Sequence, residues 1–185
     1  MYSNSPHVRH SSIISRMPFF YGWVILAASA LARFISSPGQ TFLISVFIDP
    51  IISELGWSRT LVSSLYTAGS LTAGVAVIFV GHLLDRYGAR IMLLAVGILF
   101  GLAALWMSAV DHPAKLYVGF AALRTLGQGS LGLITSTLIA LWFMRLRGRA
   151  MAIGGIGGAI GMATLPIMAH ALISYTGWRN AWVVL

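Results

Sequence analysis

The chain contains no cysteine and only four acidic residues among its 185 residues. The absence of cysteine excludes disulfide bonds and thiolate metal sites, although it does not fix the cellular compartment. Charged residues make up 9% of the sequence and apolar residues 58%, whereas a soluble domain has about 25% charged residues. This composition excludes a sizeable soluble core and is typical of a membrane protein.

The few charges are mostly basic, and they give a formal net charge of +8. In a soluble protein this excess would indicate nucleic-acid binding. Here the basic residues are spread thinly between long apolar runs. We therefore interpret them as a signal of membrane topology and expect no nucleic-acid partner.

The apolar runs predict an all-α fold, a polytopic membrane helix bundle. A run of about 20 apolar residues crosses a bilayer core of ~30 Å at ~1.5 Å per residue. Residues 1–18 are polar and basic, and we expect them to form a disordered cytoplasmic tail. Residues 19–185 predict an incomplete six-helix half-bundle of five full transmembrane helices and the start of a sixth. The expected spans are 19–52, 60–81, 90–110, 115–144, 149–175 and 178–185.

The start of the first span has an alternative interpretation. Arg16, the apolar run to Leu26 and the small residues at 28–30 imitate a secretory signal with its cleavage site. We favour a membrane span, because the sequence downstream is still membrane-like and Arg33 follows at once.

The basic residues outside the spans orient the bundle. Seven lie in the tail and in the turns after the second and fourth spans, and three lie in the opposite loops. The positive-inside rule then places the amino terminus in the cytoplasm, in a multi-pass protein of the cell (plasma or inner) membrane. The sixth run stops after about eight residues, roughly 12 Å of helix, which cannot cross a bilayer. We therefore expect a fragment that lacks its second half.

Two arginines lie well inside apolar spans, at Arg33 and Arg124. Each costs roughly 2.5–3.5 kcal/mol on insertion scales, so each needs a reason. Gln128 and Thr135 follow Arg124 at i+4 and i+11, which predicts one polar stripe on the fourth span. Gln40 follows Arg33 on one side if that helix continues.

No acidic residue lies deep in any span, so the two arginines predict a positively charged cavity. Such a cavity suits an anion, most simply a carboxylate held by a guanidinium group. We therefore take Arg124, Arg33, Gln128, Gln40 and Thr135 as candidate substrate-binding residues. The alternative is that both arginines reach the membrane surface or bind backbone carbonyl groups of neighbouring helices.

Proline and glycine mark two further features of the spans. Pro38-Gly39 lies in the middle of the first span, where it predicts either a break that lines a binding site or a simple kink. In the fifth span Gly154, Gly157, Gly158 and Gly161 predict close helix packing rather than a ligand site.

The segment between the second and third spans is a compact charged turn. Gly81 and Gly88 permit a tight path, and Asp85, Arg86 and Arg90 must remain near the lipid headgroups or pair with each other. The segment therefore predicts a hairpin of two membrane helices that reverses at the membrane surface.

This turn, residues 81–90 (GHLLDRYGAR), resembles the signature between the second and third helices of the major facilitator superfamily, with Ala89 where a basic residue is usual. Residues 124–129 (RTLGQG) resemble the fourth-helix motif of that superfamily with its membrane-embedded arginine. The segments 21–23 (YGW), 56–60 (GWSRT), 142–150 (WFMRLRGRA) and 177–179 (GWR) are most similar to its monocarboxylate and oxalate/formate porter branch.

The resemblance implies secondary active transport by alternating access, with two six-helix halves around a central site. It implies a small organic anion as substrate, moved by proton symport or by exchange. It also implies a conformational gate in the turn, where Asp85 makes a contact in one transport state that breaks in the other. The remaining partner would be the missing carboxyl-terminal six-helix half or a separate chain.

Two other functional classes are alternatives to transport. A non-transporting membrane subunit would use the arginines for packing and assembly. An intramembrane enzyme would need a nucleophile with its base, a metal-ligand cluster or a phosphate loop, and the sequence has no such pattern. We expect neither a cofactor nor a catalytic site.

Overall fold

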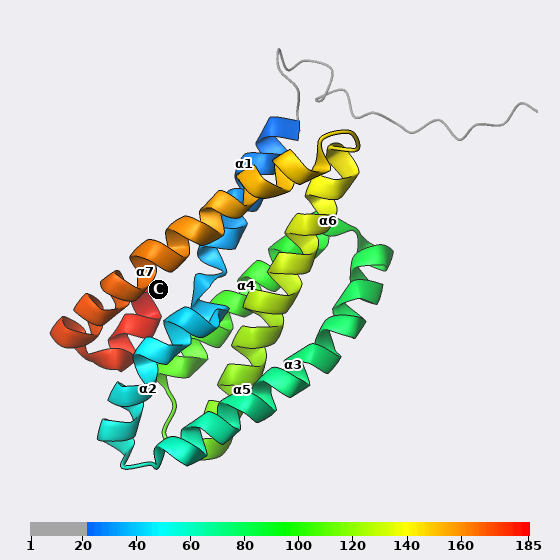
Figure 1. The fold of residues 1–185 in the computed structure, drawn as a ribbon. Coiled ribbons are helices and arrows are strands. Elements are labelled where there is room, and N and C mark those ends of the chain that lie inside the picture. Colours follow the sequence, from blue (N-terminus) through cyan, green and yellow to red (C-terminus); the bar gives the residue numbers. More distant parts are fainter. Residues whose placement is uncertain (1–21) are drawn as a thin grey trace, which may run out of the picture.

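The structure is a computed structural model that describes residues 22–185, and within that range it contains helices and no strand (Figure 1). The predicted tail 1–18 lies outside the described residues. The elements are α1 (Gly22–Ile35), η2 (Ser37–Gly39), α2 (Thr41–Leu55), α3 (Arg59–Tyr87), α4 (Ala89–Ser108), α5 (Pro113–Leu123), η3 (Arg124–Leu131), α6 (Gly132–Trp142) and α7 (Arg147–Val184).

Three of the described helices are long and apolar enough to cross a membrane by themselves, namely α3, α4 and α7. Two further chain segments reach a comparable length only as interrupted helices: α1 continues through η2 into α2, and α5 continues through η3 into α6. The all-helical class is therefore as predicted. The count of five spans and the start of a sixth stays a prediction.

The first interruption lies at the predicted Pro38-Gly39 position. Helix α1 ends at Ile35, the short 3-10 helix η2 holds Pro38 near its start, and Gln40 adopts an extended backbone with φ −90° and ψ 150°. Proline lacks the N–H that a continuous helix would need. Because Ser37, Pro38 and Gly39 are buried, the interruption is a break inside the bundle rather than a simple kink.

The second interruption is a π-helix, η3, that the sequence did not predict. A π-helix forms i→i+5 hydrogen bonds and so shifts the register of every later residue relative to an α-helix. The two interruptions lie against each other: a Cβ added to Gly127 of η3 would lie 2.9 Å from the Cα of Gly39. This close approach requires glycine on both sides.

The turn after α3 is shorter than the sequence suggested. The expectation that Gly81 lies in the turn is wrong, because α3 continues as a regular helix to Tyr87. The reversal needs only Gly88, whose φ of 78° and ψ of 158° are open to glycine. Gly177 has almost the same backbone angles, φ 80° and ψ 159°, and there α7 bends sharply.

Glycines of α7 set its distance from α1, beside which it runs in Figure 1. A Cβ at Gly157 would collide with the carbonyl oxygen of Ala30, and one at Gly161 would collide with the Ser37 hydroxyl. Gly154 is similarly close to Ile139 of α6. Gly158 does not make such a close contact and lines a cavity described below.

The end of the bundle opposite the Gly88 turn is joined by side chains of α2 and α7 and by a backbone carbonyl group of α4. Glu54 of α2 accepts hydrogen bonds from Trp178 Nε1 and from Arg179 Nε, at 2.5 and 2.9 Å. Arg179 also donates to the carbonyl oxygen of Ser108 at the end of α4. In the nearby α4–α5 loop, the hydrogen bond from Lys115 lowers the pKa of Asp111.

Candidate functional site

Arg124 is the first residue of η3, and its guanidinium group is held from three directions. Its Nη1 donates to Thr41 Oγ1 at 3.0 Å and also to Gln128 Oε1. The guanidinium carbon lies 5.3 Å from the ring centroid of Tyr66, in a cation–π contact. Arg124 is therefore tied to η3, α2 and α3 at the broken part of the bundle.

Arg33 lies in the last turn of α1 and lines a cavity of about 350 Å³. Ser37, Gln40, Gln128 and Gly158 line the same cavity. The Arg33 Nε and the Ser37 hydroxyl are shielded from solvent and have no hydrogen-bond partner among residues 22–185. Two polar groups beside the cavity are thus unsatisfied within the described part of the chain.

Gln128 connects the two arginines. Its Oε1 accepts from Arg124, while the residue also lines the cavity beside Arg33 and Gln40. Four of the five predicted substrate-binding residues therefore gather where η2 and η3 interrupt their helices. This is the position at which irregular backbone is tolerated in a membrane and can line a binding site.

Thr135, the fifth predicted residue, does not join this group. It is fully buried, and its hydroxyl donates to the carbonyl oxygens of Leu131 and Gly132 in its own helix. The prediction assumed continuous α-helical periodicity from Arg124. The π-helix between them changes that periodicity, and the shared face with Arg124 is lost.

No acidic residue in the described part of the chain pairs with Arg33 or Arg124. Three of the four form ion pairs near helix ends, Asp49 with Arg59, Glu54 with Arg179 and Asp111 with Lys115. The fourth is Asp85. Within residues 22–185 neither Arg33 nor Arg124 forms an ion pair, and no cluster of three histidine or acidic residues could hold a metal ion.

The predicted gating residues surround the end of α3. Asp85 is exposed and forms no ion pair within the described residues, so the expected pairing with Arg86 or Arg90 is not seen. Arg86 instead contacts the ring of Tyr87, at 5.6 Å from the centroid. Arg90 is exposed in the first turn of α4.

Two residues of the arginine site, Thr41 and Tyr66, were not among the predicted substrate-binding residues. Thr41 begins α2 directly after the break, and its Oγ1 lies 2.8 Å from the Tyr66 hydroxyl. Tyr66 belongs to α3, 25 positions further along the chain. The only available signal for Tyr66 was its hydroxyl among the serines and threonines of residues 60–72, and a tyrosine there is equally compatible with the core.

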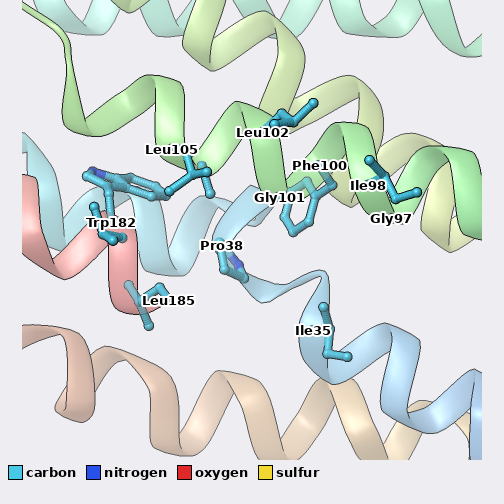
Figure 2. Close-up of a pocket in the computed structure, with 12 residues that line it drawn as sticks. Ile35, Pro38, Gly97, Ile98, Phe100, Gly101, Leu102, Leu105, Trp182 and Leu185 are labelled. Atoms are coloured by element: carbon cyan, nitrogen blue, oxygen red, sulfur yellow. The ribbon is translucent and has the colours of Figure 1, made fainter.

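A second cavity, of about 390 Å³, has a different character (Figure 2). Its walls come from η2, α4 and the end of α7, and they include Pro38, Phe100, Leu105, Trp182 and Leu185. The residues that line it carry no charge, so we do not consider it for an anion.

Sequence comparison identifies the group of proteins to which this arrangement belongs. The family model described as Major Facilitator Superfamily matches residues 12–185. The chain belongs to the Major Facilitator Superfamily. This confirms the resemblance seen in the turn after α3 and in the residues around Arg124.

Relatives in the Major Facilitator Superfamily are named as transporters. The chain is 31% identical to the probable L-galactonate transporter of Escherichia coli (strain K12), over 73% of this chain and 30% of that protein. It is 26% identical to the riboflavin transporter RibJ of Trypanosoma cruzi (strain CL Brener), over 85% and 34%. It is 22% identical to monocarboxylate transporter 6 of Mus musculus, over 89% and 35%. The chain thus spans about a third of the length of these relatives.

Proposed function

We propose that this chain forms the amino-terminal part of a secondary active transporter for a small organic anion, with a carboxylate as the recognised group. Transport proceeds by alternating access and is coupled to protons or to exchange. The transporter lies in the cell membrane with its amino terminus in the cytoplasm, and a second six-helix half completes the cavity.

The observation that carries the proposal is the pair of arginines without acidic partners at the two helix breaks. Arg33 has an unpaired Nε beside a cavity, and Gln128 links that cavity to Arg124. Both arginines are half-buried. A guanidinium without a counter-ion inside a membrane is costly, and an anionic substrate would reduce that cost. Binding would then require a negative charge on the substrate.

The names of the relatives support a carboxylate without selecting one. One is named for L-galactonate, another for monocarboxylates and a third for riboflavin. Riboflavin provides an informative contrast, because it has no carboxylate group. A site built on two arginines should prefer the carboxylates.

Uptake into proteoliposomes tests the proposal. The complete transporter, consisting of this chain with its carboxyl-terminal half, is reconstituted and supplied with radiolabelled lactate, gluconate or riboflavin. We expect accumulation of a carboxylate, driven by an inward proton gradient or by unlabelled carboxylate inside. Arg33→Gln should abolish it, whereas Arg59→Gln, at the exposed pair with Asp49, should retain it.

Other outcomes would contradict the proposal. Folded protein that accumulates riboflavin but no carboxylate would exclude an anion site. Folded protein that transports none of the three and binds no carboxylate would favour a non-transporting membrane subunit.

A further inference from the structure

Arg124 is restrained through one of its three guanidinium nitrogens. Among the described residues both of its hydrogen bonds leave from Nη1, one to Thr41 and one to Gln128. Arginine has five N–H donors in a rigid planar fork, two of them on each terminal nitrogen and one on Nε. The edge formed by Nε and Nη2 is therefore left without a partner within residues 22–185. That edge matches the geometry of a carboxylate or phosphate group.

Tyr66 contacts the Arg124 guanidinium group and also the threonine that accepts its hydrogen bond. Its ring lies under the guanidinium group at 5.3 Å from the centroid, and its hydroxyl is 2.8 Å from Thr41 Oγ1. The same threonine oxygen accepts from Arg124. Tyr66 and Thr41 thus restrain one guanidinium group through its face and through its Nη1 end.

The Tyr66 ring is itself fixed from the core. It packs edge-to-face on Phe120, with centroids 5.5 Å apart and an interplanar angle of 86°. Phe120 is 1% exposed and precedes Arg124 by four residues. The tyrosine ring therefore lies across the junction of α5 and η3, with the buried phenylalanine of α5 at one end and the arginine of η3 at the other.

We propose that Tyr66 and Thr41 are positioning residues that hold the Nε–Nη2 edge of Arg124 open for an anion. This inference rests on the proposed function, in which Arg124 receives a carboxylate. The Tyr66 hydroxyl fixes Thr41, the Tyr66 ring lies against the guanidinium group, and Thr41 together with Gln128 occupies Nη1. The anion then meets an oriented fork rather than a mobile cation.

The chain supplies a matched control. Thr72 of α3 and Tyr117 of α5 form a second hydroxyl pair, with the two oxygens 2.7 Å apart. As at the arginine site, the threonine is exposed and the tyrosine half-buried. Arg124 is hydrogen-bonded to neither residue of this pair. Tyr117→Phe therefore removes the same atom as Tyr66→Phe without affecting the arginine.

The test has one arm that needs no substrate. The full-length transporter is purified with ¹⁵N-labelled arginine, the Arg124 Nε–H signal is assigned by its loss in Arg124→Lys, and its order parameter is measured. We expect a restrained Nε–H in the unmodified protein and lower order in Tyr66→Phe and in Thr41→Val. Tyr117→Phe should leave the signal unchanged.

The second arm measures lactate and gluconate affinity of the same samples by titration calorimetry. For whichever carboxylate binds, loss of one positioning hydrogen bond should raise the Kd by about fivefold. Tyr117→Phe should leave its affinity unchanged.

Each outcome has a defined meaning. Unchanged Arg124 order in both Tyr66→Phe and Thr41→Val would overturn the positioning role, and so would equal loss of order in Tyr117→Phe. Reduced order in a protein whose unmodified form binds neither carboxylate would leave the positioning geometry standing while the proposed function fails. If Tyr66→Phe does not fold, Thr41→Val carries the same test from an exposed position.

Discussion

Gly39 and Gly127 bring the two broken segments of the bundle into backbone contact. A Cβ on Gly127 would lie 2.9 Å from the Gly39 Cα and 2.6 Å from Cε2 of Phe100. Real side chains essentially never approach so closely. The 3-10 helix and the π-helix are thus packed as a unit, and the arginine site is built around that contact.

Gly127→Ala should therefore destabilise the protein and disturb the site. Overpacking in a closely packed interior costs about 1–3 kcal/mol. Gly97→Ala is the control, because a Cβ there meets nothing within 4 Å. Thermal unfolding in detergent should show a lower Tm for Gly127→Ala and an unchanged or slightly higher Tm for Gly97→Ala. Equal Tm values would show that the Gly39–Gly127 contact is not a constraint.

Glu54 should contribute more to stability than the other acidic residue of α2, Asp49. Glu54 accepts from the indole of Trp178, which is 3% exposed, and from Arg179. Its removal leaves a buried donor unsatisfied, at a cost of about 1–3 kcal/mol. Asp49 pairs with Arg59, and both side chains are about 70% exposed, so that pair is worth about 0–1 kcal/mol. Glu54→Ala should lower Tm clearly, and Asp49→Ala should lower it little; the reverse order would be incompatible with this structure.

Single cysteines introduced into this chain test the membrane orientation, and the chain itself adds no background because it has no cysteine of its own. Leu146 lies in the basic turn before α7, and His112 caps the start of α5. In intact cells a membrane-impermeant thiol reagent should label His112→Cys and leave Leu146→Cys unlabelled until the cells are opened. Labelling of Leu146→Cys from outside would reverse the orientation. A cysteine at Ser3 should behave like Leu146→Cys, although that position lies outside the described residues.

Asp85 should affect the rate of transport rather than substrate binding. It is the acidic residue of the basic turn, exposed and without an ion pair within residues 22–185. We propose that Asp85 makes its ion-pair contact in only one of the two transport states. Asp85→Asn should slow turnover of the complete transporter by about tenfold while the substrate affinity stays within a few-fold. Asp111→Asn, at the pair with Lys115, serves as control. Normal turnover in Asp85→Asn would reduce the turn to a topology signal.

The sequence predicted neighbours at short separation and failed over longer stretches that contain the π-helix. Gln128 lies four residues after Arg124 within η3, and at that separation the two side chains still meet. Thr135 was misplaced because the π-helix intervenes, and nothing in single-residue propensity signals an i→i+5 turn. Gly81 was misplaced because one glycine in an apolar helix is tolerated and Gly88 alone suffices for the reversal.

Contacts between helices could not be predicted from the sequence pattern. Tyr66 and Thr41 are 25 positions apart, and their hydroxyl pair depends on how α2 and α3 pack. Periodicity identifies which residues share a helix face, but it does not say which face of another helix lies opposite. The predicted Pro38-Gly39 break could be foreseen because its cause is local, a missing backbone donor.

The central claim is that Arg124 receives the anionic group of the substrate, and its most direct test is the carboxylate affinity of folded variants. The complete transporter is purified as the unmodified protein, as Arg124→Lys and as Arg124→Gln, and titrated with the carboxylate that it transports. Arg124→Lys keeps the charge but loses the bidentate fork, so its Kd should rise. Arg124→Gln should go further, because a hydrogen bond to a charged group is worth about 1.5–3 kcal/mol, or about 10- to 150-fold in Kd. Unchanged Kd in folded Arg124→Gln, with only lower abundance or Tm, would show that Arg124 is structural and would contradict the account.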